Sequence, residues 1–161
     1  MKKIHSSLLA ILLALLTTVT FTACSSDDND SPSGEDLKTN IVGMWQTTHV
    51  SGWTYDDTED ENLIKIDQDI TDKSDDAQRI LFKGDGSCYI YYYSTYRDKW
   101  VSESDNYTYE ISGNKIIVYY NKSTVEQTYT VLSLKGDVLI MQYCMDEGDS
   151  YKTNITCKRV N

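Results

Sequence analysis

Residues 79–96 read RILFKGDGSCYIYYYSTY, in which Gly84-Asp85-Gly86 separates two segments rich in apolar and aromatic residues. Glycine and aspartate tolerate the positive φ of a tight turn, whereas isoleucine, phenylalanine and tyrosine fit the pleated surface of a strand. The stretch therefore predicts a β-hairpin with one strand over residues 79–83 and the next over residues 88–96.

The same pattern continues through the rest of the chain, where short segments rich in Tyr, Ile, Val and Thr are separated by turn residues. Helical periodicity is hard to find, and this pattern is typical of antiparallel sheets. Tyr107, Tyr109 and Ile111 alternate with two polar residues, which indicates a strand with one solvated face. Further strands are expected at residues 44–50, 107–111, 115–120, 125–134, 138–145 and 151–160.

Eight sequential strands joined mostly by short turns leave unpaired edges unless the sheet closes. An antiparallel up-and-down barrel removes these edges and encloses either packed side chains or one small ligand. A two-sheet sandwich is the alternative, but it would need long crossovers, and only residues 55–78 are long enough for one. We therefore predict an all-β, eight-stranded barrel domain over residues 40–161.

Gly43-Met44-Trp45 at the start of the first strand resembles the Gly-x-Trp motif of lipocalins. Arg159 stands where that family has an arginine that packs over the tryptophan, a contact that contributes about 0.5 to 2 kcal/mol. Residues 81–87, 109–116 and 134–140 are also similar to the lipocalin-like domains of bacterial surface lipoproteins. The resemblance implies that Gly43, Trp45 and Arg159 close one end of the barrel.

In lipocalins the loop after the first strand is long and folds over the barrel mouth, and the acidic stretch 55–78 falls there. A short ordered piece is expected around residues 63–66. The loop is either a lid or a calcium site, since carboxylates are calcium ligands. Residues 67–72, DQDITD, do not match the spacing of an EF-hand loop, so we predict an exposed, solvated loop and no metal site.

The chain has 13 tyrosines and two phenylalanines. Tyrosine suits a surface that is half buried and half wet. Tyr91 and Tyr93, with Trp53 and Trp100 near strand ends, are candidates for a surface that stacks on a sugar ring or lines a pocket. The alternative is that they fill the barrel and form cross-strand pairs.

Three cysteines follow Cys24, an odd number for a compartment that can be oxidising. Cys144 and Cys157 are equidistant from a turn centred near residues 150–151, so a last hairpin with that turn makes them candidates for a disulfide. Free buried thiols are the alternative. His49 is the one histidine after the N-terminal segment, and we expect it to be structural, not a base or a metal ligand.

The N-terminus combines Lys2 and Lys3, an apolar run and Phe21-Thr22-Ala23-Cys24, as in an export signal. The small residue before the cysteine resembles the bacterial lipobox. The resemblance implies that residues 1–23 are removed and that acyl chains on Cys24 hold the protein to a membrane. Residues 24–39 are predicted to be a flexible acidic tether. Its Ser-Asp-Asp run is similar to a signal for the outer face of the outer membrane, and a solvated spacer is the alternative. We therefore expect a lipid-anchored protein of the outer membrane, on the cell surface in preference to the periplasmic face.

The chain has 15 basic and 25 acidic residues and a formal net charge of −10. This charge argues against nucleic acid and anionic lipid head groups as partners. No catalytic or cofactor motif is recognisable, and no acid is paired with an organised second group. We expect a non-enzymatic lipoprotein without cofactor that binds a small hydrophobic or glycan ligand at the barrel mouth. The alternative is a filled barrel that serves as a subunit of an outer-membrane or surface complex.

Overall fold

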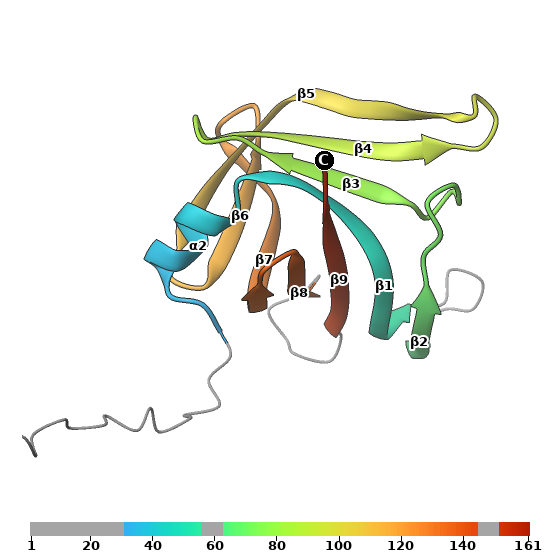
Figure 1. Cartoon of the computed structure of the whole chain (residues 1–161), viewed down its shortest axis with the longest axis horizontal. Coiled ribbons are helices and arrows are strands. Elements are labelled where there is room, and N and C mark those ends of the chain that lie inside the picture. The colour runs from blue at the N-terminus through green and yellow to red at the C-terminus, as the bar shows by residue number, and fades with distance from the viewer. Residues whose placement is uncertain (1–30, 56–62, 145–151) are drawn as a thin grey trace, which may run out of the picture.

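The computed structural model describes residues 31–55, 63–144 and 152–161. Its nine strands form one antiparallel sheet in the order β2-β1-β3-β4-β5-β6-β7-β8-β9, and β9 pairs back onto β1 (Figure 1). This closes β1 and β3 to β9 into an eight-stranded barrel, which confirms the predicted fold class. The strands are β1 (Gly43–Tyr55), β2 (Leu63–Asp69), β3 (Gln78–Phe82), β4 (Ser87–Ser94), β5 (Lys99–Ser112), β6 (Lys115–Tyr120), β7 (Thr124–Lys135), β8 (Val138–Cys144) and β9 (Lys152–Val160).

The hairpin predicted from residues 79–96 is β3 and β4, with Phe82 opposite Cys88 and Gly86 at φ 83° in the turn. β5 begins at Lys99, earlier than predicted. Its first half pairs with β4, and pairing with β6 starts only at Tyr107. The first half therefore has one strand neighbour and a wet surface, which explains why its polar sequence does not resemble a core strand.

The barrel wall divides along β1. Gly43 to Gln46 pair with β3, whereas His49 to Tyr55 pair with β2, on the side of β1 that faces away from β9. Residues 70–77, here called the bridging segment, connect β2 with β3 across this division. Ile70 and Ala77 are buried there against Tyr93. The ordered piece expected around residues 63–66 is therefore confirmed as part of β2, and most side chains over residues 64–76 are exposed. The prediction of a loop is wrong for residues 63–69, because they form a strand paired with β1, and Ile70 and Ala77 are buried.

Helix α2 (Gly34–Asn40) covers one end of the barrel (Figure 1). Ser33 caps its first turn by accepting a hydrogen bond from the backbone N–H of Asp36, and Leu37 and Ile41 are fully buried in the core. The predicted flexible tether is therefore wrong from residue 34 onward, because burial of these two side chains holds the segment against the barrel. Among the described residues no helix is long and apolar enough to cross a membrane.

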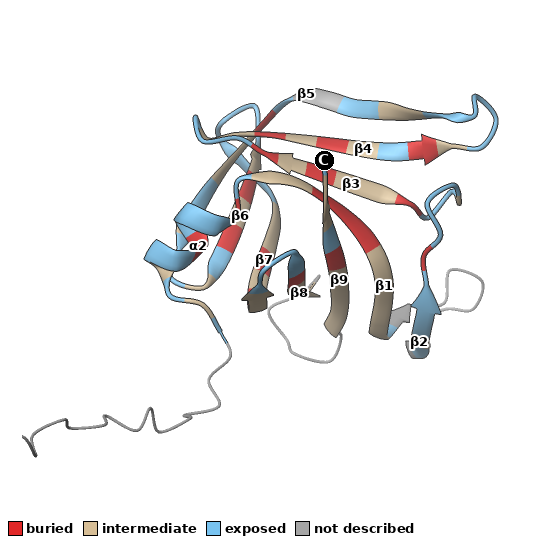
Figure 2. Cartoon of the chain, in the orientation of Figure 1, coloured by how far each residue is buried: buried red, intermediate tan, exposed pale blue. Residues whose placement is uncertain are grey.

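The buried residues concentrate at this helix-covered end (Figure 2). Trp45 is fully buried, and its indole N–H donates to the carbonyl of Ile41 at 2.7 Å. Arg159 lies over the indole ring with its Cζ 4.3 Å from the centroid, so the expected contact between the first and last strands is present. The same guanidinium donates to the carbonyls of Asn40 and Val42, both at 2.6 Å.

Gly43 makes room for this guanidinium. Its φ is 135°, which disfavours other residues, and a Cβ there would collide with Nη1 of Arg159. The three residues that the lipocalin resemblance singled out therefore meet at one end of the barrel.

We predict that Arg159→Ala lowers the free energy of unfolding by about 2–4 kcal/mol, because it removes a cation–π contact and two charge-assisted hydrogen bonds. Arg159→Lys keeps the positive charge but lacks the planar guanidinium that donates to two carbonyls at once. Its decrease in the free energy of unfolding should therefore be intermediate. Urea unfolding followed by circular dichroism measures both. Lys158→Ala, at the exposed neighbouring position, is the control, and an equal loss there would contradict the assigned role.

Candidate functional site

A pocket of about 230 Å³ lies in the mouth of the barrel, one layer beyond Trp45 and away from α2. Four strands and the end of the bridging segment contribute to it. We call it the mouth pocket, and it is lined by Thr47, Val50, Asp75, Asp76, Ala77, Gln78, Tyr92, Thr153 and Ile155.

The layer beneath the mouth pocket is filled by large side chains. Trp45, Phe82, Leu139 and Met141 are each less than 2% exposed. Thr47 marks the floor, where its hydroxyl lies 3.9 Å from the sulfur of Cys157. The mouth pocket is thus shallow and does not continue to the helix-covered end as a channel.

The described lining residues combine an apolar wall with hydrogen-bonding groups and include no basic side chain. Val50, Ile155 and the Tyr92 ring supply the apolar surface. Asp75 is held by the hydroxyl of Thr95 at 2.7 Å, and Asp76 accepts from the amide of Gln68 at 3.4 Å. With two carboxylates and no cation, the mouth pocket favours neutral or cationic ligands over anions.

The aromatic residues singled out in the sequence lie elsewhere. Tyr93 and Trp100 pack edge to face with centroids 5.5 Å apart, and Tyr93 is 5% exposed. Arg79 lies over the Trp100 ring with its Cζ 4.0 Å from the centroid. A hydrogen bond from the Tyr93 hydroxyl to Asp98 raises the pKa of that tyrosine. This pair therefore contributes to packing around the bridging segment.

Tyr91 lies on the same face of β4 as Tyr93, and Trp53 is exposed on β1 opposite Lys65. Neither lines the mouth pocket. Tyr92, between the two predicted tyrosines, points to the other face and does line it. The sequence alone does not show which of these three consecutive tyrosines faces the pocket. Alternation along the strand separates them into two faces, but it does not tell which face lies inside the barrel.

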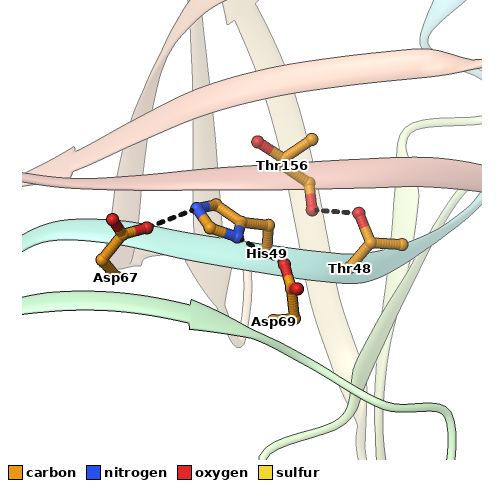
Figure 3. Close-up of polar contacts among 5 residues, drawn as sticks. All are labelled: Thr48, His49, Asp67, Asp69 and Thr156. Atoms are coloured by element: carbon orange, nitrogen blue, oxygen red, sulfur yellow. Dashed lines mark hydrogen bonds and ion pairs between the residues drawn. The ribbon is translucent and has the colours of Figure 1, made fainter.

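His49 joins β1 to β2 on the outer face of the barrel (Figure 3). Its Nε2 lies 3.1 Å from Asp67 Oδ1, and its Nδ1 lies 2.8 Å from Asp69 Oδ1. The histidine thus links β1 to β2 through two carboxylates. The same contacts occupy two acids of the stretch considered for calcium, and the described part of the chain holds no group of His, Cys, Asp or Glu suited to a metal ion.

The cysteines at 88, 144 and 157 are free thiols. The possible disulfide is wrong because the register of β8 and β9 sets Cys144 opposite Lys152 and Cys157 opposite Leu139. The last hairpin turns earlier in the chain than predicted, which separates the two sulfurs. Burial raises the pKa of Cys88 to about 12 and that of Cys157 to about 11, so neither supplies a thiolate nucleophile near neutral pH. Cys24 lies outside the described residues.

The family model described as lipocalin-like domain matches residues 41–141. The chain belongs to the lipocalin-like domain family. No characterised protein and no solved structure gives a significant match. The matched region of this lipocalin-like domain begins at the carbonyl that receives the Trp45 indole and ends in β8. β9 and Arg159 lie beyond it, so the closing contact between Arg159 and Trp45 is known from the structure and not from the match.

We predict that a maleimide or iodoacetamide reagent modifies Cys144 of the native lipocalin-like domain long before Cys88 or Cys157. A thiol pKa raised by two units or more leaves about a hundredfold less thiolate at pH 8, and burial adds steric protection. Peptide mass spectrometry after timed labelling measures the three rates. Labelling in urea is the control, since all three should then react alike. Modification of Cys157 as fast as Cys144 in the native protein would be incompatible with the structure.

Proposed function

We propose that this lipocalin-like protein is a lipid-anchored, non-enzymatic binding module whose mouth pocket takes a small glycan. The observation that carries the proposal is the pairing of the Tyr92 ring and Ile155 with Gln78, Thr153 and two carboxylates around one hollow. Sugar rings present an apolar face that packs on aromatic rings, and their hydroxyls bond to amides and carboxylates.

The size of the mouth pocket favours a sugar-sized ligand over a long apolar one. Its volume of about 230 Å³ is below the roughly 300–1,000 Å³ typical of sites for drug-sized ligands. The packed layer of Trp45, Phe82 and Met141 beneath it leaves no path for an acyl chain toward α2. Of the two ligand classes expected from the sequence, the glycan is the better fit.

The proposed anchor is the lipidated Cys24, and the proposed place is the outer membrane, with the domain on the cell surface. Two observations support this arrangement. Residues 21–24 have the character of a lipoprotein processing site. The chain also enters the domain through α2, which covers the end of the barrel away from the mouth pocket (Figure 1). A domain held from that end turns its mouth away from the bilayer.

We predict that Tyr92→Ala weakens binding of a glycan ligand up to about tenfold, because it removes the stacking surface of the mouth pocket. A glycan array probed with the detergent-solubilised full chain identifies the ligand, and calorimetry gives the dissociation constants. Tyr96→Ala is the matched control, since Tyr96 is 95% exposed and does not line the pocket.

Two results would refute the glycan proposal. One is an array without binding to any glycan. The other is a glycan dissociation constant that is the same for Tyr92→Ala as for the control Tyr96→Ala.

A second function is favoured by the filled interior. A barrel packed with residues such as Trp45, Phe82 and Met141 suits a subunit that works through its outer surface. Non-denaturing mass spectrometry of the protein from its native host separates the two functions, because one predicts a retained small molecule and the other a retained protein partner.

A further inference from the structure

One edge of β2 has no strand partner among the residues that the structure describes. β2 pairs with β1 through all seven of its residues and stands at the end of the strand order. Each of the other described strands has a neighbour on both sides along at least part of its length, because β9 closes onto β1; the first half of β5, which pairs only with β4, is the other open stretch. An unpaired edge presents free backbone N–H and C=O groups and is a template for another strand.

Proteins usually blunt such an edge with proline, a bulge or an inward-pointing charge. β2, with the sequence LIKIDQD, has no proline, and its register with β1 shows no shift. Gln68 lies opposite Val50 of the mouth pocket, so Ile64, Ile66 and Gln68 share the inner face, and none of them is charged. Ile64 is 44% exposed. Of the common protections, β2 has only charged side chains, and these lie on its outer face.

The outer face of β2 carries all of its charges. Lys65, Asp67 and Asp69 alternate along it, on the face where His49 lies. Lys65 is exposed and has no ionic partner among the described residues. A partner strand that places a carboxylate opposite Lys65 and an amine opposite Asp67 would complement this face.

A second copy of β2 meets this requirement in one antiparallel register. When Ile66 lies opposite Ile66 of the other copy, Lys65 of each lies opposite Asp67 of the other. A shift in one direction puts Lys65 opposite Lys65. A shift in the other keeps two attractive pairs, Lys65 with Asp69 of the other copy, but adds a repulsive pair of Asp67 with Asp67. Opposite charges facing each other across two strands are stabilising and like charges are destabilising, so charge selects the Ile66-centred register.

We propose that this protein forms a twofold dimer by antiparallel pairing of β2 with β2 of a second copy, centred on Ile66. Such an interface is isologous, because the same edge serves both copies. It joins the two barrels into one continuous sheet and brings a partner strand beside the exposed Ile64 of both copies. The mouth-pocket residues keep their positions, so the dimer does not depend on the glycan proposal.

Cysteine cross-linking tests the register directly. In a Cys144→Ser background of the full chain, Ile66→Cys should form a disulfide-linked dimer under mild oxidation, because each residue 66 faces its own copy at cross-strand distance. Ile64→Cys is the matched control, since it is on the same face and strand but lies opposite Gln68 of the partner. Peptide mass spectrometry identifies the bond. Cross-linking of Ile66→Cys no faster than that of Ile64→Cys would overturn the register.

Charge reversal tests the interface by an independent route. Lys65→Glu and Asp67→Lys each replace two attractive cross-strand pairs by two repulsive ones, so each should raise the dimer dissociation constant about tenfold or more. Mixing the two variants should restore pairing, because every facing pair in the mixed dimer is then opposite in charge. Sedimentation velocity over a concentration series measures association, and thermal unfolding by circular dichroism confirms that both variants remain folded.

Three outcomes would overturn the proposal: an unmodified protein that is monomeric at every concentration, a dimer that is insensitive to Lys65→Glu, or mixed variants that stay monomeric. Glycan binding measured on the same samples reports on the proposed function separately.

Discussion

The structure depends on the contact of Arg159 with Trp45. A barrel closes only if its first and last strands meet, and this guanidinium lies over an indole of the first strand while belonging to the last. It also donates to the carbonyl of Asn40 at the end of α2 and to that of Val42 just beyond it. One side chain therefore fixes strand closure, the helix that covers the barrel, and the conformation of Gly43 between them.

The end of the barrel with the mouth pocket is built differently from the end that Arg159 closes. β1 is long, with 13 residues; its first part pairs with β3 and its second part pairs with β2. The wall therefore divides, and the bridging segment fills the division with Ile70 and Ala77. The same segment brings Asp75 and Asp76 to the mouth pocket. The polar lining of the pocket and the unpaired edge of β2 are thus two consequences of one division in the wall.

The sequence predicts those elements whose position is set by short-range features, namely side-chain alternation and turn residues. β6 begins and ends at the predicted residues, because its alternation and the turns beside it are written in the sequence. Helix α2 was missed because its stability comes from burying Leu37 against a distant core, and a polar composition does not record that. The register of Cys144 was missed because the turn that sets it carries several acceptable turn residues. The sequence does not single out Tyr92 from Tyr91 and Tyr93, because all three positions carry the same side chain.

The proposed anchor and the proposed β2 dimer together constrain how two copies would meet. Paired β2 strands run antiparallel, so the two barrels point in opposite directions and their α2 helices lie at opposite ends of the dimer. The β2 edge lies beside the mouth, and α2 covers the other end (Figure 1). Under the proposed anchor at Cys24, a domain held upright would present its free edge away from its own membrane. The proposed dimer would then join copies on two facing surfaces and not upright copies on one bilayer.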